Sequence, residues 1–187
     1  MDQIKLLVDK AKKGDPEAFE QLVITYQDRV YRLCYQLTGN YADAQDLSQN
    51  VFIKAYRALP NFRNEADLGT WLHRITVNLF INEKRKRKPD LYLDSPVQTD
   101  EGSMSRLAVS NDAGPEEIYE QKEFHNLVRS ALEELSPEHR TVLVLREIEG
   151  YSYDEIAAML NCSLGTIKSR INRGRQSLKA KIIQLAN

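Results

Sequence analysis

The sequence predicts an all-α fold of two small helical domains joined by an acidic flexible linker. Apolar residues recur at steps of three and four through most of the 187 residues, as they do in amphipathic helices. This spacing disappears over 89–123, where nine acidic residues outnumber two basic ones and three prolines occur. We therefore expect domains at 1–88 and 124–187, with 89–123 as the linker between them.

Three helices are expected in the N-terminal domain. Residues 15–39 begin with Asp15 as N-cap, followed by a proline suited to the first turn, and they end on a glycine. Residues 40–60 begin with Asn40 as N-cap and end on a proline. The third helix runs from about 70 to 88 and ends in five consecutive cations, which favour a helix C-terminus.

In the C-terminal domain, helical spacing resumes over 124–135. Ser136 then starts a second helix, whose apolar face includes Leu145 and Ile148, and Gly150 ends it. We therefore expect two consecutive helices before position 150.

The remaining residues have the pattern of a helix-turn-helix. Ser152 and Glu155 have the spacing of a capping box that opens a short helix, and 161–163 form a tight turn. Ser163 caps the last helix, in which 165–181 carry six basic residues and no acidic one. Because surface helices usually mix their charges, we interpret this helix as DNA-binding rather than as a merely solvated basic surface.

Other classes of function are disfavoured by the sequence. It contains no P-loop, HExxH, GxSxG or GxGxxG motif, and His73, His125 and His139 lack the spacing of metal ligands. We therefore expect no enzyme, cofactor or metal site. The two cysteines are far apart, which fits a reducing cytosol, and no apolar stretch approaches the ~20 residues needed to cross a bilayer. A cytoplasmic location is expected.

Both domains resemble parts of one protein family. The C-terminal domain resembles the fourth conserved region of the extracytoplasmic-function (ECF, group 4) sigma factors of the sigma-70 family, through LSPEHRTVLVLREIEGYSYDEIAAMLNCSLGTIKSRINRGRQSL. The N-terminal domain resembles their second region, through YADAQDLSQNVFIKAYRALPNF and TWLHRITVNLFINEKRKR. The resemblance covers about 10–88 and 124–182, in the family's order. It implies an alternative sigma factor that binds core RNA polymerase and directs it to promoter DNA.

The resemblance also implies which residues bind the polymerase. In the family, a helix with the pattern D-A-x-D-x-x-Q docks on the clamp helices of the largest polymerase subunit. The matching positions and their neighbours are Asp43, Asp46, Gln49, Phe52 and Lys54.

A second set of residues is implied to bind the minus-ten promoter element. Members of this branch hold one flipped-out base of the non-template strand in a pocket formed by a loop and the following helix. A pocket with apolar walls and an amide group is chemically suited to a flipped base. The matching positions are Phe62, Asn64, Ile75, Thr76 and Asn78, with Lys84 and Arg85 as phosphate contacts.

A third set is implied to bind the minus-thirty-five element. Lys168, Ser169, Asn172 and Arg173 lie outside the apolar stripe of the last helix and are expected to reach base edges. The expected phosphate contacts are Thr166, Arg170, Arg175 and Arg146.

Two further features of the family bear on partners. The linker between the two regions threads through the polymerase toward the RNA exit channel in the family, although an inert acidic tether is the alternative here. The resemblance also implies an anti-sigma factor, often membrane-anchored, that covers both domains and holds the chain inactive at the inner membrane face. The alternative function is a conventional helix-turn-helix regulator, which would bind an operator without joining polymerase.

Overall fold

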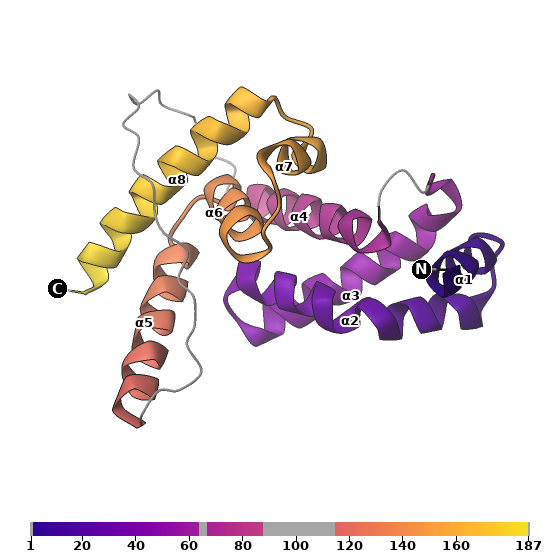
Figure 1. Ribbon diagram of the computed structural model, residues 1–187, viewed down its shortest axis with the longest axis horizontal. Helices are drawn as coiled ribbons and strands as arrows, with labels where there is room; N and C mark the ends of the chain where they lie inside the picture. Colours follow the sequence, from indigo (N-terminus) through magenta and orange to yellow (C-terminus); the bar gives the residue numbers. More distant parts are fainter. Residues whose placement is uncertain (1, 64–66, 88–114, 187) are drawn as a thin grey trace. The chain divides into compact units, whose positions relative to one another are not determined.

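A computed structural model describes residues 2–63, 67–87 and 115–186 (Figure 1). Every regular element in these ranges is a helix, so the predicted all-α class is confirmed. Two compact units divide the chain at residues 83 and 84. None of the described helices has both the length and the apolar character that crossing a membrane would require.

Within its described residues, the first unit contains three long helices and two shorter elements. They are α1 (Asp2–Lys12), α2 (Pro16–Thr38), α3 (Tyr41–Ala58), a 3₁₀ turn (Leu59–Asn61) and α4 (Leu68–Arg87), the last of which runs past the division between the units. Helices α2 and α3 pack side by side, and α1 lies against α2 and the 3₁₀ turn. Leu33, Leu47 and Phe80, from three different helices, are each less than 2% exposed and form the centre of the core.

The ends of α2 and α3 lie where local sequence chemistry predicts them. The Asp15 carboxylate accepts the backbone N–H groups of the first turn of α2, at 3.0 and 3.1 Å. Gly39 ends the helix in the left-handed region, at φ 80°, and donates its N–H to the carbonyl of Tyr35. Asn40 then accepts the N–H of Asp43 at 2.8 Å and starts α3.

Helix α1 was not predicted from the sequence. Its buried residues Val8 and Ala11 are three positions apart, and the half-buried Ile4 and Leu7 continue the same spacing. The ammonium group of Lys12 donates a hydrogen bond to the carbonyl of Phe62 at 2.6 Å. Because these apolar residues recur at steps of three and four, their spacing was sufficient to predict the helix.

The described part of the second unit contains four α-helices besides the end of α4. They are α5 (Pro115–Glu133), α6 (Pro137–Leu143), α7 (Tyr153–Leu160) and α8 (Leu164–Leu185), and a π-helical turn (Val144–Ile148) continues α6. Helix α8 packs against the other three, and Ile156, Ile167 and Ile171 are at most 1% exposed in the core. Helix α5 begins at Pro115, within the segment that the composition predicts as a linker, and 88–114 lie outside the described residues.

One predicted core position is wrong. Ile148 was expected on the apolar face of the helix that starts at Ser136, but its side chain is 50% exposed. The helix widens into the π turn after Leu143, with a hydrogen bond from the Glu149 N–H to the Val144 carbonyl, so the regular 3.6-residue spacing no longer applies.

A buried histidine lies in the core of the first unit. His73, on α4, is 0% exposed, and its pKa is lowered from 6.5 to about 4. Burial is the largest cause, and the positive charges of Arg29 and Arg32 act in the same direction, whereas Asp67 opposes them. His73 is therefore neutral in the folded chain near neutral pH.

This histidine should make the first unit sensitive to acid. Because the pKa of His73 is lower in the folded chain, the folded state binds fewer protons than the unfolded state below pH ~6.5. The contribution of His73 to the free energy of unfolding is therefore complete above pH ~6.5. It decreases as the pH falls below that value and is lost as the pH falls through about 4. We expect protonation of His73 to lower the free energy of unfolding by about 2–4 kcal/mol. Urea unfolding at pH 7 and pH 4.5, followed by the fluorescence of Trp71, measures it.

The comparison that isolates His73 uses two variants. His73→Gln should lower stability at pH 7 and flatten the pH dependence, whereas His125→Gln, an exposed position on α5, should leave the dependence unchanged. Equal pH dependence in wild type and His73→Gln would contradict the assignment.

Candidate functional site

The helix-turn-helix is built by the two caps that the sequence predicts. Ser152 and Glu155 form a reciprocal capping box, with hydrogen bonds of 2.7 Å from the Ser152 N–H to the carboxylate and 3.2 Å from the Glu155 N–H to the hydroxyl. The hydrogen bonds that the Glu155 carboxylate accepts from Ser152, first from its backbone N–H and then from its side chain, lower the pKa of Glu155. Helix α7 ends at Asn161, whose φ of 51° is left-handed, so the chain turns sharply toward α8.

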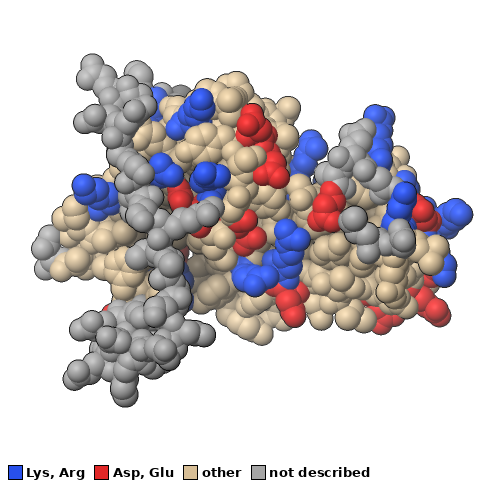
Figure 2. All heavy atoms as spheres, in the orientation of Figure 1, with Lys and Arg blue, Asp and Glu red and all other residues tan. Residues whose placement is uncertain are grey.

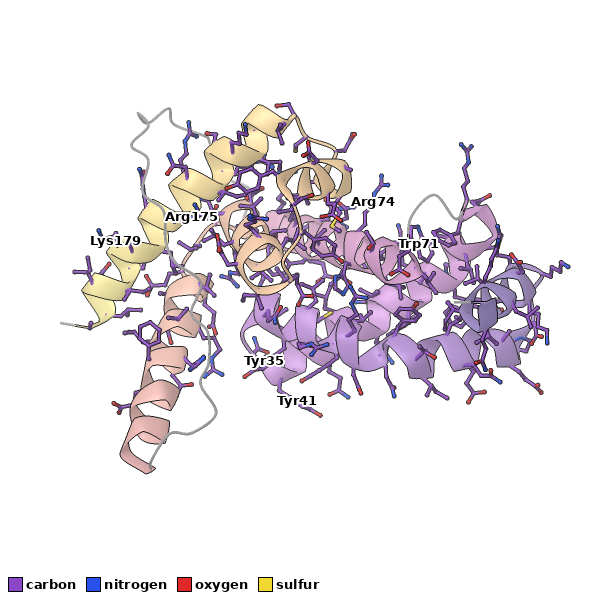
Figure 3. All side chains as sticks on the ribbon, in the orientation of Figure 1. Tyr35, Tyr41, Trp71, Arg74, Arg175 and Lys179 are labelled. Atoms are coloured by element: carbon purple, nitrogen blue, oxygen red, sulfur yellow. The ribbon has the colours of Figure 1, made fainter. Side chains whose placement is uncertain are left out.

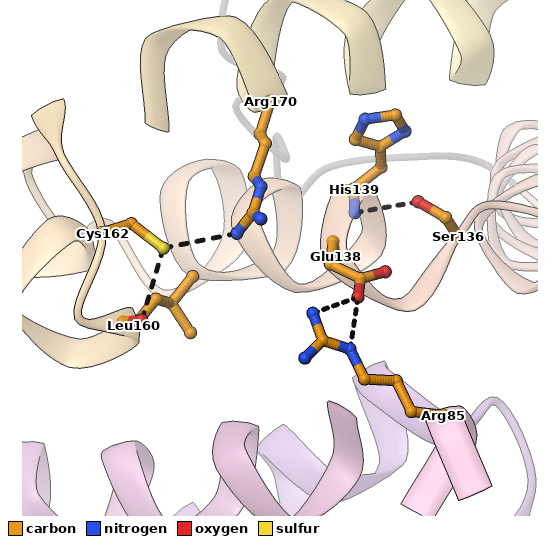
Figure 4. A network of polar contacts seen from close by, with 7 residues as sticks. All are labelled: Arg85, Ser136, Glu138, His139, Leu160, Cys162 and Arg170. Atoms are coloured by element: carbon orange, nitrogen blue, oxygen red, sulfur yellow. Dashed lines mark hydrogen bonds and ion pairs between the residues drawn. The ribbon is translucent and has the colours of Figure 1, made fainter. Parts of the chain in front are cut away.

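Polar contacts connect the turn to α8. The Ser163 hydroxyl accepts the Thr166 N–H at 3.1 Å and lies 2.8 Å from the Thr166 hydroxyl. The guanidinium of Arg170 donates to the Cys162 sulfur at 3.5 Å, and that thiol donates to the Leu160 carbonyl at 3.3 Å (Figure 4). Thr166 and Arg170 therefore make contacts within the protein, in addition to their expected role at phosphates.

Apolar packing decides which face of α8 is outward. Ile167, Ile171 and Gly174 are buried, as the sequence predicts, while Leu178 is half-buried. Gly174 lies close to α6, because a Cβ built there would be only 3.2 Å from two side-chain carbons of Leu143. The helix therefore cannot rotate about its axis without a steric clash.

The side chains expected to read bases lie on the outward part of α8. Lys168 is exposed, and Ser169, Asn172 and Arg173 are half-buried. Figure 2 shows Lys and Arg side chains over the part of the surface that α8 occupies. The structure thus brings these four positions together on the first three turns of one helix, which is the part of a recognition helix that contacts base edges.

Two arginines expected at phosphates have partners inside the protein. Arg146 donates to the Tyr151 carbonyl at 2.9 Å, and its guanidinium lies 5.0 Å above the ring of Tyr153. Arg175 forms an ion pair with Glu147, with nitrogen–oxygen distances of 2.6 and 3.1 Å. Partial burial opposes the charged form of Arg175, but the hydrogen bond and the charge of Glu147 outweigh it and raise the pKa of Arg175.

Sequence reasoning missed Glu147. Its partner lies 28 positions away in the chain, and no local pattern relates the two residues. Charge alone was the available indication, because the helix at 165–181 has no acidic residue of its own.

The expected polymerase-binding residues lie along α3. Asp46, Gln49 and Lys54 are exposed, whereas Asp43 and Phe52 are half-buried. Asp43 lies in the first turn, where its carboxylate accepts a hydrogen bond from the side-chain amide of the N-cap Asn40 at 3.2 Å. Asp46, Gln49 and Lys54 are therefore the members of this set with exposed hydrogen-bonding side chains.

Sequence reasoning also missed an aromatic cluster beside this set. The ring of Tyr31 lies 6.5 Å from that of Tyr35 and 6.0 Å from that of Tyr41, which is 68% exposed. Tyr35 and Tyr41 lie where α2 and α3 meet (Figure 3). Tyr31 and Tyr35 are four positions apart, which places them on one face of α2. The sequence was therefore sufficient to predict this pair, but not its contact with Tyr41.

The expected minus-ten set is divided between accessible and buried positions. Asn78 is exposed and Ile75 is half-buried on α4, and Lys84 and Arg85 follow on the same helix, half-buried and exposed respectively. Asn64 lies outside the described residues.

Two members of this set lie in the core. Phe62 is 7% exposed and its ring is 4.9 Å from that of Trp71. Thr76 is 0% exposed, and its hydroxyl donates to the Leu72 carbonyl at 2.9 Å. Neither Phe62 nor Thr76 offers more than a small surface to a base, so Asn78 and Ile75 are the accessible ones among the described residues that are expected to hold the base.

Comparisons with known proteins find similar sequences for both parts of the chain. The family model for sigma-70 region 2 matches residues 22–89, and that for sigma-70 region 4 matches 125–178. The chain is 39% identical to the ECF RNA polymerase sigma factor SigW of Bacillus subtilis, over 97% of this chain and 98% of SigW. It is 36% identical to the ECF RNA polymerase sigma-E factor of Escherichia coli K12, over 95% and 93% of the two chains.

A solved structure is similar over nearly the whole chain. CnrH, determined in complex with the cytosolic domain of CnrY, has a TM-score of 0.62 and 25% sequence identity, with 95% of this chain and 96% of CnrH covered. The similarity to known proteins therefore includes the fold as well as the sequence.

The close approach at Gly174 can be tested by adding one methyl group. Gly174→Ala should lower the free energy of unfolding of the second unit by about 1–2 kcal/mol, because Leu143 is only 2% exposed and has little room to move. Gly165→Ala is the matched control, since its nearest neighbouring atom would be 3.8 Å away. It should leave stability unchanged or raise it by up to about 1 kcal/mol, because alanine favours a helix over glycine. Thermal unfolding followed by circular dichroism measures both. A Gly174→Ala chain as stable as Gly165→Ala would contradict the packing argument.

Proposed function

The chain belongs to the extracytoplasmic-function branch of the sigma-70 family, and we propose that it brings core RNA polymerase to promoters through α3, α4 and α8. It is an alternative sigma factor, and sigma factors are initiation factors rather than enzymes. The observation that carries this conclusion is a similarity that extends over nearly the whole chain and includes both regions in the family's order. The domains at 1–88 and 124–187 would then be regions 2 and 4, and 89–123 would connect them.

We assign polymerase docking to the outward face of α3. Asp46 and Gln49 are exposed and stand three positions apart, so they lie on the same side of the helix. The buried stripe of this helix, which includes Leu47 and Val51, faces the core instead. Polar side chains beside a rigid buried stripe are held in place at little conformational cost, which suits them to bind the polymerase. Asp43, Phe52 and Lys54 extend the same helix surface.

We assign minus-ten recognition to α4. The exposed amide of Asn78 is able to donate and accept hydrogen bonds at the Watson–Crick edge of a flipped base. Ile75, three positions earlier, supplies apolar surface on the same side. The buried Phe62 and Thr76 would then support these residues from behind, and Lys84 and Arg85 would contact phosphate at the end of the helix.

We assign minus-thirty-five recognition to α8. Its outward side chains, Lys168, Ser169, Asn172 and Arg173, include donors and acceptors that match base edges in the major groove. Thr166, Arg170 and Arg146 would contact the phosphate backbone and so set the register of the helix.

Regulation is assigned to a partner protein. We expect an anti-sigma factor, often membrane-anchored in this family, to cover both units and hold the chain inactive. The similar protein CnrH was determined in complex with the cytosolic domain of CnrY. We place the chain in the cytoplasm, where it would meet core polymerase, with sequestration at the inner membrane face while the anti-sigma factor is bound.

Run-off transcription tests the function directly. Core RNA polymerase supplemented with this chain should start transcription at discrete sites in a genomic DNA library, whereas core alone should not. A conventional regulator would instead bind an operator by itself and produce no new start sites with core polymerase. Absence of chain-dependent start sites would therefore favour the regulator and overturn the proposal.

The docking face supplies a matched pair of variants for the same assay. Asp46→Ala with Gln49→Ala should weaken binding to core polymerase and reduce run-off product, with an unchanged melting temperature because both side chains are exposed. Asp9→Ala with Gln3→Ala removes the same residue types from exposed positions on α1 and should leave both measurements unchanged. Wild-type core affinity in the first double variant would reject this assignment.

Base reading by α8 predicts a change in sequence preference. Lys168→Ala and Arg173→Ala should each cost about 1–3 kcal/mol at the correct minus-thirty-five element and flatten the preference at particular base pairs. Lys179→Ala removes an exposed cation further along α8 and should weaken binding to all promoter sequences alike. Holoenzyme binding to a set of promoters with single base-pair changes measures the preference. Intact preference in both α8 variants would show that the outward face only grips phosphate.

A further inference from the structure

The Glu147–Arg175 ion pair connects the π turn to the recognition helix. The two side chains are 38% and 24% exposed, and one carboxylate oxygen accepts hydrogen bonds from two nitrogens of the guanidinium, at 2.6 and 3.1 Å. Partial burial opposes the charged form of Arg175, but this pairing with Glu147 raises its pKa, and Tyr153 acts in the same direction as Glu147. The donors of Arg175 are therefore directed at groups of the protein.

The turn that carries Glu147 is itself held in place. Its neighbour Arg146 is bonded to the Tyr151 carbonyl and lies against the Tyr153 ring, and the Tyr151 N–H donates to the Leu145 carbonyl at 3.0 Å. These contacts fix the π turn, so the carboxylate of Glu147 is held in place beside α8.

Arg175 lies on the edge of the DNA-facing surface of α8. Lys168, Asn172, Arg175 and Lys179 are spaced by four, three and four positions, so they form one row along the helix. Figure 3 shows that Arg175 and Lys179 lie along α8. A cation in this row is placed to contact DNA phosphate if its donors are available.

A carboxylate and a phosphate compete for the same guanidinium donors. A carboxylate is planar and a phosphate group is tetrahedral, but arginine binds the oxygens of either one through the same set of N–H groups. N–H groups that point at the carboxylate are therefore not available to the phosphate. Because both side chains are partly exposed, the pair is weak enough for a substitution to release Arg175 without unfolding the domain.

We propose that Glu147 is a positioning residue that keeps Arg175 away from DNA phosphate and so reduces by one the phosphate contacts of the recognition helix. The ligand concerned is the sugar–phosphate backbone of duplex DNA, and the inference rests on the assignment of α8 to DNA binding. Discrimination by α8 then depends more on its base-reading side chains, because phosphate contacts are the same on every sequence. In this proposal Arg175 does not contact phosphate in the wild-type chain, which differs from the expectation drawn from the sequence.

The test compares the salt dependence of DNA binding between the wild-type chain and variants of the ion pair. Glu147→Gln keeps a side chain of the same shape but removes its charge, so Arg175 should gain a phosphate contact and the slope of log affinity against log salt should steepen by about 0.9. Between 50 and 200 mM salt, affinity for duplex DNA should then fall about threefold more than in wild type. Glu147→Ala should behave in the same way.

Arg175→Gln combined with Glu147→Gln decides whether the effect passes through Arg175. The double variant should return to the wild-type slope, because no released arginine is present. If the steeper slope persists in the double variant, or never appears in the single variants while their circular dichroism is that of wild type, the inference is overturned. A merely structural role for Glu147 would change the melting temperature but not this slope.

The assay also separates this inference from the proposed function. Holoenzyme containing each chain is measured on a promoter duplex and on the same duplex with a scrambled minus-thirty-five element. If wild-type holoenzyme does not prefer the promoter, the assignment of minus-thirty-five recognition fails. The role of Glu147 is then still decided by the slopes of the full chain alone on the scrambled duplex.

Discussion

The packing of α8 on α6 is the constraint on which the proposed DNA-binding surface depends. Successive residues of a helix point about 100° apart, so a rotation by one position would bury polar side chains and expose Ile167 or Ile171. The approach of Gly174 to Leu143 prevents such a rotation, because there is space for a hydrogen atom but little for a methyl group. The direction of Lys168 is therefore a consequence of apolar contacts on the opposite side of the helix.

Neighbouring acids and acceptors then decide which cations of α8 are available. Arg175 is paired with Glu147, Lys181 forms a 2.6 Å ion pair with Glu134, and Arg170 is bonded to Cys162. The six basic residues of the segment are thus not equivalent, even though they belong to one helix. The proposed separation of base-reading from phosphate-binding residues would arise from these contacts as much as from position along the helix.

The first unit combines a rigid apolar core with polar side chains at its surface. Buried residues of α2, α3 and α4 meet in the core, and Asp46 and Asn78 lie on the outer sides of two of these helices. His73 and Thr76 are fully buried polar residues on α4, close in sequence to the accessible Ile75 and Asn78. The helix proposed to hold a base is therefore fixed by packing along its inner side, which keeps its outer side chains in a defined place.

By itself, the sequence determined the features that arise from interactions between near neighbours. The caps at Asp15, Ser152 and Ser163 and the glycine after α2 were predictable because each depends on residues within a few positions. The apolar spacing likewise predicted the helices and most of their buried faces, and the order of the two matched regions identified the family.

Only the tertiary structure decided the availability of individual side chains. The pairing of Arg175 with Glu147, the burial of Phe62 and Thr76 and the exposure of Ile148 all depend on distant residues or on the widened turn after α6. A repeating pattern assigns a face to each residue but says nothing about what approaches that face from another helix. Such contacts are set by how side chains of different helices fill the same space, and this is a property of the packed chain rather than of any local segment.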